Sequence, residues 1–378
     1  MKKHSITHLF TGFVLLFTSI AVLSAPIARA QTQTNETYVK AQVNQITEER
    51  FLIHEDDMFY DPLKGDPQYQ TIQRATYEIL EGEHKGVIFE SENEISNRIY
   101  DLNLKEGDKV MLFVRVFEDG SLEGFATDYV RNNTMIVLIL FFVGALILIG
   151  KMKGLRAVAS LIVTVGSIFF ILIPLTLQGY NPLLTASLIA VLVTVTTILL
   201  ISGLNKKAFS AIIGTLAGVF LAVLIAYAAG NLSMLTGLSG EDAKILYMNK
   251  PDLNFTHIFF ASVLIGALGA IMDVGMSISS AVHEVGKANP GIDEKNLFKA
   301  GINVGKDIMG TMSNTLILAY AGSALPLLLL FSMNEFSTMQ IINFDFVAAE
   351  IVRALSGSFG LLLAIPVTAL TSCLLQKR

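Results

Sequence analysis

Residues 134–150 read TMIVLILFFVGALILIG, a run without a single charged side chain. An α-helix rises about 1.5 Å per residue, so this run is close to the length that crosses the roughly 30 Å hydrocarbon core of a bilayer. The residues before it have the opposite character, because residues 31–133 hold 21 Asp or Glu against 10 Lys or Arg, a net charge of −11. The run therefore divides the chain into an acidic, polar part and a part predicted to lie in a membrane.

Apolar runs of spanning length recur along the rest of the chain. The composition agrees, since the 378 residues are 52% hydrophobic and 16% charged, whereas soluble globular domains carry about 25% charged residues. We therefore expect an α-helical polytopic membrane protein with seven spans. The predicted spans lie at about 134–150, 157–178, 182–203, 208–229, 257–280, 307–332 and 347–374.

The first thirty residues have the pattern of an export signal. Two lysines precede an apolar run from Leu9 to Leu23, and residues 28–30 (Ala-Arg-Ala) form a small-x-small cleavage site. We expect residues 1–30 to be a cleaved signal peptide, with an uncleaved anchor helix as the alternative. Both alternatives place the following segment outside the cytoplasm.

Basic residues in the short loops predict the same orientation. The loops on one side of the predicted spans carry only Lys244 and Lys250, together with Arg131 just before the first span. The positive-inside rule therefore puts the C-terminus in the cytoplasm and the acidic domain outside, in the plasma membrane of a bacterial cell. The loops on the side predicted to be cytoplasmic carry Lys151, Lys153, Arg156, Lys206, Lys207, Lys287, Lys295, Lys299, Lys377 and Arg378.

Residues 31–133 are expected to form a small β-rich extracytoplasmic domain. Residues 38–46, 71–80 and 110–117 alternate partly between apolar and polar side chains, which is the period of a half-buried strand. About a hundred residues of short strands suit a compact barrel or sandwich. The acidic net charge argues against nucleic acid as a partner.

Ionisable side chains inside spanning helices are costly and are therefore functional candidates. The fifth predicted span contains Asp273, the sixth begins with Asp307, and the seventh contains Glu350 and Arg353. Each lies on a stripe of small or polar residues at helical spacing, and we expect the three stripes to face one another or a water-filled cavity. Asp307 has a structural alternative, as a cap on a helix that begins near the membrane surface.

Position along the helices separates the candidates into two groups. Asp273 and Asn314 are predicted at similar depths in the cytoplasmic half, whereas Glu350 and Arg353 are predicted in the external half. Asp273 has no basic residue on its own helix, so we expect a protonatable carboxylate or one that coordinates a cation with Asn314 and Ser277. Glu350 and Arg353 lie three residues apart on one helix. They either have a functional role or form a structural ion pair in which each neutralises the other.

The spans also contain weak internal similarity. Spans two to four and spans five to seven cross the membrane in opposite directions, and residues 161–168 resemble residues 264–271 at a constant offset. This arrangement predicts an inverted three-plus-three repeat. Many secondary transporters are built in this way, with the binding site at the interface of the two repeats.

Two stretches resemble the signature segments of the YibE/F family of bacterial membrane proteins. They are residues 269–280, GAIMDVGMSISS, and residues 305–320, GKDIMGTMSNTLILAY. The resemblance implies an exported N-terminal region followed by a multi-span, permease-like domain. It implies no particular substrate.

These features predict a permease or secondary transporter that moves a small solute or ion across the lipid bilayer, with Asp273 as coupling or coordinating group. The alternative is a non-transporting envelope scaffold whose exterior domain binds an envelope protein. The sequence has no nucleotide-binding, nucleophile-elbow or zinc motif and a single cysteine, Cys373. We therefore expect no enzymatic activity, no cofactor and no bound metal.

Overall fold

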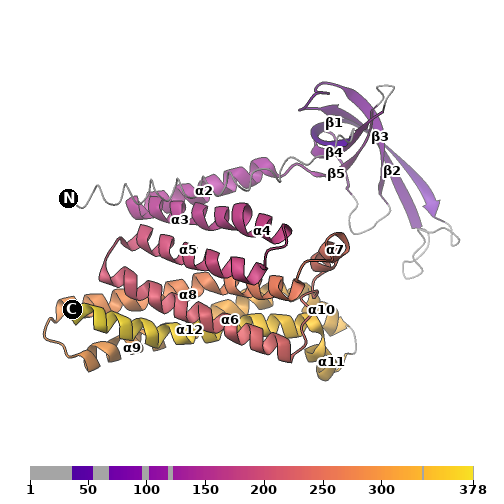
Figure 1. The fold of residues 1–378 in the computed structure, drawn as a ribbon. Coiled ribbons are helices and arrows are strands. Elements are labelled where there is room, and N and C mark those ends of the chain that lie inside the picture. The colour runs from indigo at the N-terminus through magenta and orange to yellow at the C-terminus, as the bar shows by residue number, and fades with distance from the viewer. Residues whose placement is uncertain (1–35, 54–67, 96–101, 118–121, 334–335, 378) are drawn as a thin grey trace. The chain divides into compact units, whose positions relative to one another are not determined.

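We describe the fold from a computed structural model of the chain. The described residues fall into two compact units, one ending at Gly144 and the other beginning at Ala145, and each unit is treated by itself (Figure 1). The predicted signal peptide, residues 1–30, lies outside the described residues. The described ranges are 36–53, 68–95, 102–117, 122–333 and 336–377.

The N-terminal unit is an antiparallel sheet. In the described residues its strands lie in the order β3-β2-β1-β4-β5, and each strand runs antiparallel to its neighbours. The longest strand, β1, is central because it pairs with β2 on one side and with β4 on the other. The strands are β1 (Glu36–Ile53), β2 (Gln68–Ile79), β3 (Ile88–Ile95), β4 (Lys109–Val116) and β5 (Leu122–Tyr129).

This sheet curls into a half-barrel around an apolar core. The two outer strands approach each other, since a methyl group added at Gly124 of β5 would lie 3.1 Å from the ring of Phe89 in β3. Alternate residues of the strands point inward, which is the two-residue period of a β-strand. The buried core consists of Val39, Ala41, Val43, Ala75, Tyr77, Ile79, Leu104, Val110, Leu112 and Val114.

The three strands predicted from alternation are confirmed as β1, β2 and β4, with longer or slightly shifted ends. The strands β3 and β5 were not predicted. Their sequences, IFESENEI and LEGFATDY, are rich in acidic residues or contain glycine, so neither shows a clear apolar alternation. Both are edge strands, where one side of the backbone has no pairing strand and a continuous apolar pattern is not required.

The second unit is helical, and α2 (Asn132–Gly150) begins before the boundary between the units. Its long helices run side by side, with the short helices α7, α10 and α11 gathered at one end, here called the α7 end (Figure 1). The elements are α3 (Met152–Ser167), the π-helical η2 (Ile168–Leu172), α4 (Ile173–Leu177), α5 (Pro182–Ser202), α6 (Lys206–Leu232), α7 (Glu241–Asn249), α8 (Phe255–Ala288), α9 (Glu294–Ser323), α10 (Leu325–Met333), α11 (Thr338–Asn343) and α12 (Asp345–Lys377).

Six of the described helical segments are long and apolar enough to cross a membrane, which indicates a membrane protein. They are α2, the continuous segment Met152–Leu177, α5, α6, α8 and α12. The predicted span at 307–332 corresponds to α9 and α10, which meet at a bend of 60°. The described part of the chain therefore has six such segments, or seven if this bent pair is one span.

The connection between the fifth and sixth predicted spans is shorter than the apolar pattern indicated. The spans were expected to end at Ser280 and to resume at Asp307, but α8 continues to Ala288 and α9 begins at Glu294. Asp293 caps α9, because its side chain accepts a hydrogen bond from the Asn296 N–H at 3.3 Å. The helices continue beyond their apolar stretches because polar residues in their end turns need not enter hydrocarbon.

The helices α6 and α12 cross at unusually close range. A methyl group added at Gly218 would lie 2.5 Å from the Gly360 carbonyl oxygen, and one added at Gly360 would lie 2.6 Å from the Gly218 carbonyl oxygen. The Ile271 side chain of α8 packs against both glycines. Small residues that let backbones approach closely are a common basis of helix association in membranes. Here Gly218 and Gly360 allow α6, α8 and α12 to pack together.

Gly218→Ala should therefore destabilise the helical unit by about 1–3 kcal/mol, because the added methyl group has no space. Gly269→Ala on α8 is the matched control, since nothing lies within 4 Å of a methyl group at that position and both changes raise helix propensity equally. Thermal unfolding of the purified protein in detergent would measure the difference. Equal melting temperatures for the two variants would contradict the close crossing.

Candidate functional site

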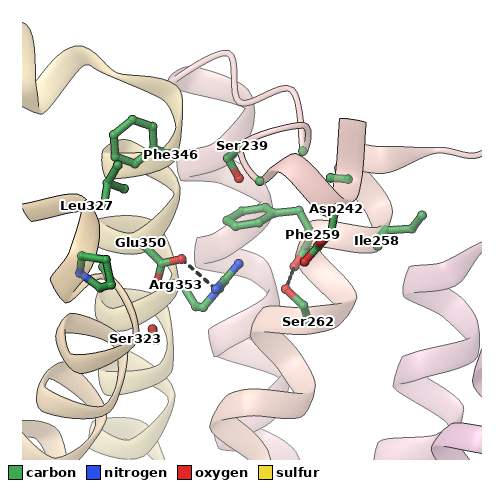
Figure 2. A pocket seen from close by; sticks show the side chains of 15 residues that line it. Ser239, Asp242, Ile258, Phe259, Ser262, Ser323, Leu327, Phe346, Glu350 and Arg353 are labelled. Atoms are coloured by element: carbon green, nitrogen blue, oxygen red, sulfur yellow. Dashed lines mark hydrogen bonds and ion pairs between the residues drawn. The ribbon is translucent and has the colours of Figure 1, made fainter. Parts of the chain in front are cut away.

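A pocket of about 440 Å³ opens at the α7 end of the helical unit. Figure 2 shows its lining side chains, with Phe346 and Leu327 on one side, Phe259 and Ser262 on the other, and Glu350 between them. The lining comes from α7, α8, α12 and the junction of α9 with α10. Segments far apart in the sequence therefore build one concave site, as is typical of small-molecule sites.

The loop before α7 closes one side of the pocket and is fixed to the helices around it. The Thr236 hydroxyl donates to Asp345 Oδ2 at 2.9 Å, at the start of α12, and the Thr256 hydroxyl of α8 donates to the Thr236 carbonyl at 3.2 Å. Gly237 follows with φ 76°, and a methyl group there would lie 2.3 Å from the Phe255 carbonyl oxygen. Only glycine suits this position, because other residues rarely adopt that φ.

The opposite side of the pocket is the bend between α9 and α10. Ser323, Ala324, Pro326 and Leu327 line the pocket at this bend. Proline has no N–H to donate within a helix and fixes its own φ, so it is favoured where one helix ends and the next begins. Pro366 instead lies inside α12, which continues through it without a break.

An ion pair on α12 is the chemical centre of the pocket. Arg353 Nη1 donates to Glu350 Oε1 at 2.8 Å, and the two side chains are only 24% and 28% exposed. The guanidinium carbon of Arg353 lies 5.4 Å from the ring centre of Phe259 and 5.8 Å from that of Tyr320. The guanidinium thus lies near two aromatic rings. The opposite charges of Glu350 and Arg353 are three residues apart on α12, which is about one helical turn.

Three polar atoms around this pair have unused hydrogen-bonding capacity. Glu350 Oε2, Arg353 Nε and the Tyr320 hydroxyl are all buried, and none has a hydrogen-bond partner among the described residues. A buried polar group without a partner costs about 1–3 kcal/mol, and more if it is charged. Glu350 and Arg353 line the pocket, whereas Tyr320 does not. A water molecule or a polar group of a solute that reached these atoms would relieve that cost.

The other predicted residues lie elsewhere. Asp273 and Ser277 are exposed on the surface of α8, and Asp307 and Asn314 are exposed on α9. Within the described residues, the Asp273 carboxylate forms no hydrogen bond or ion pair, with Asn314 or with any other side chain. The structure therefore pairs Glu350 with Arg353 in the pocket, whereas Asp273 does not line that pocket.

The aromatic residues of the site were not anticipated. Phe259 lies near the N-terminus of α8, and Tyr320 lies near the C-terminus of α9. The chain has 24 Phe and 10 Tyr, so neither residue stands out in the sequence. The signal that was present is the position of Tyr320 directly before the small residues Ala321, Gly322 and Ser323, where the helix ends. Without the fold, nothing related that helix end to Arg353.

Comparisons with known proteins identify the chain's relatives only at the level of families. Residues 138–378 match the family described as YibE/F-like protein, and residues 53–129 match the YibE/F family N-terminal domain. No curated protein and no solved structure matches the chain.

Replacing one member of the ion pair should be more damaging than replacing both. Glu350→Gln leaves a partly buried guanidinium without its counter-charge, and Arg353→Met leaves a partly buried carboxylate, so each should lower stability by less than the roughly 3–5 kcal/mol that breaking a fully buried pair costs. The double variant Glu350→Gln/Arg353→Met should recover most of this loss. Melting temperatures in detergent form the double-mutant cycle, and additive losses would show that the two side chains do not interact.

Proposed function

Since the chain belongs to the YibE/F family, and since the family match includes every residue that lines the pocket, we propose that it is a permease that binds a small polar solute at the Glu350–Arg353 pair. The observation that carries this proposal is the charged pair with unused hydrogen-bonding atoms in a pocket of the apolar helical unit. Ionisable residues among spanning helices mark substrate pathways in many transporters.

The pocket favours a solute that carries both signs of charge. Arg353 offers donors to a carboxylate, while Glu350 and the exposed Asp242 at the rim offer acceptors to an ammonium group. The rings of Phe259 and Phe346 provide apolar walls that can also accommodate a cationic group. A small zwitterion such as an amino acid fits these requirements better than a purely anionic solute, because the two acids outnumber the one base.

In this proposal the protein lies in the bacterial plasma membrane with its N-terminal unit outside and its C-terminus in the cytoplasm. Seven spans, with α9 and α10 as one bent span, give that arrangement after a cleaved signal peptide. The pocket then opens toward the outside, because α7 and the N-terminus of α8 lie on the external side. An inverted repeat of the six later spans would provide the alternating access that transport requires.

A second candidate function, an envelope scaffold, is favoured by the outer face of the half-barrel. The rings of Tyr38, Phe113 and Phe125 form a row across β1, β4 and β5, with neighbouring ring centres 5.3 Å apart. Tyr38 is 62% exposed and Phe125 is 52% exposed. An exposed aromatic row of this kind is suited to bind a partner outside the membrane.

Uptake by proteoliposomes tests the permease. We expect a panel of radiolabelled amino acids to include at least one that accumulates, while its amine-only and carboxylate-only analogues do not. Arg353→Gln should reduce uptake about tenfold or more, since the loss of a buried charge contact exceeds the 1.4 kcal/mol that a factor of ten represents. Asp273→Asn should reduce accumulation against a gradient, because the amide cannot release a proton.

The double variant Tyr38→Ser/Phe125→Ser separates the two functions. A permease should keep its uptake with these rings removed, whereas a scaffold should lose its envelope phenotype in cells. If no member of the panel is taken up and only the aromatic variant has a cellular phenotype, the scaffold replaces the permease.

A further inference from the structure

Three helices each place one residue on the inner side of the pocket. Ser262 of α8, Ser323 of α9 and Arg353 of α12 line the pocket, and in Figure 2 they lie on the side away from Phe346. Both α8 and α12 begin at the α7 end, whereas α9 ends there. The next helical turn into the unit therefore lies about four residues later on α8 and α12 and three or four residues earlier on α9.

That next turn is a packed layer, which we call the floor. On α12, a methyl group added at Gly357 would lie 3.1 Å from Ala267 Cβ of α8 and 3.5 Å from Leu316 Cδ1 of α9. On α8, a methyl group added at Gly266 would lie 2.5 Å from the Tyr320 hydroxyl of α9. Each of the three helices thus contacts the other two at this level, so the floor closes the pocket on its inner side.

The contact between Tyr320 and Gly266 is the part of the floor that can open most easily. Ala267 and Leu316 are buried in the core of the unit, so opening the floor at Gly357 would require whole helices to separate. Gly266 is exposed, and it meets the end of a side chain rather than a backbone. Rotation of Tyr320 into another χ1 rotamer is therefore enough to open the floor here.

Tyr320 is held in place by a contact of its ring and not by a hydrogen bond of its hydroxyl. The hydroxyl is buried and has no hydrogen-bond partner among the described residues, although a buried tyrosine hydroxyl usually has one. The ring centre lies 5.8 Å from the guanidinium carbon of Arg353, at the distance of a cation–π contact. A solute that draws the guanidinium toward itself would weaken this contact.

We propose that Tyr320 is the inner gate of the pocket. In its present position the ring blocks the path from the pocket toward the opposite end of the helical unit. The gate opens when the ring turns away from Gly266, and the contact with Arg353 couples this rotation to occupation of the pocket. Alternating access requires such a closure on one side of a binding site. The coupling rests on the proposed permease function, whereas the closure itself does not.

Cysteine accessibility tests the gate before any solute is known. In a Cys373→Ala background, Ser262→Cys reports on the pocket, and Leu316→Cys reports on the floor one turn deeper than Tyr320. Right-side-out and inverted membrane vesicles are treated with a charged, membrane-impermeant methanethiosulfonate. The side from which Ser262→Cys reacts identifies the pocket side. From that side Leu316→Cys should react about tenfold more slowly or less, because packed side chains exclude the reagent.

Removal of the ring should open the floor. Tyr320→Ala should raise the rate of Leu316→Cys from the pocket side about tenfold or more, because reaction follows exposure of the thiol. Tyr320→Phe is the matched control, since it keeps the ring and should leave the rate unchanged. Val193→Cys on α5, where the wild-type side chain is 2% exposed, should stay unreactive with Tyr320→Ala, which would show that the unit has not loosened as a whole.

Two variants that keep Tyr320 test how it is held. Gly266→Ala should raise the rate of Leu316→Cys, because its methyl group takes the space of the hydroxyl, whereas Gly269→Ala should not, since nothing lies within 4 Å of that position. Arg353→Gln should raise the rate as well, because it removes the cation–π contact. An unchanged rate with Arg353→Gln would overturn the coupling.

The gate and the permease can fail separately. Equal rates for Leu316→Cys and Ser262→Cys with Tyr320 in place, no reaction of Ser262→Cys from either side, or rates of Leu316→Cys unchanged by both Tyr320→Ala and Gly266→Ala would overturn the gate. If the rates follow expectation and no amino acid is taken up, the floor is closed by Tyr320 but the permease is wrong. Uptake with rates that ignore Tyr320 would keep the permease and remove the gate.

Discussion

The close crossing of α6 and α12 is the constraint on which the helical unit depends. At Gly218 and Gly360 the two backbones are so near that neither residue has space for a methyl group. Apolar helices in a membrane gain little from burying side chains against each other, because lipid is equally apolar. They associate where shapes fit closely, and this crossing is such a fit. The side chain of Ile271 lies against both glycines, so the crossing also sets the rotation of α8.

The rotation of α8 and the course of α12 determine where the ionisable groups lie. With Ile271 directed into the crossing, Asp273 is two residues farther along the helix and therefore on the outward side. On α12, Arg353 precedes Gly360 by seven residues, which is about two helical turns, so it lies on the same inward side toward the α7 end. One packing contact thus directs a charged pair into the unit and a single carboxylate out of it.

The sequence predicts where the helices lie better than which way each helix face is turned in the fold. The apolar runs identify the helices because a membrane imposes length and hydrophobicity on each span separately. Periodicity also identifies the stripe that contains Asp273, but it cannot tell whether that stripe faces the unit or points away, since direction depends on Gly218 and Gly360 in two other helices. The pocket could not be predicted from the sequence for the same reason. Its loop before α7, its bend at Pro326 and its rings at Phe259 and Tyr320 come together only after the long helices have packed.

The different positions of the two polar groups follow from their charge. Glu350 and Arg353 neutralise each other over 2.8 Å, so one chain can enclose them at the cost of a few unused hydrogen-bonding atoms, and those atoms become available to a solute. Among the described residues Asp273 forms no ion pair, and an apolar interior would penalise its ionised form heavily. In agreement with this cost, the fold leaves Asp273 on the surface of α8. In a membrane an ionised carboxylate on that surface is also unfavourable, because the surrounding lipid solvates it poorly.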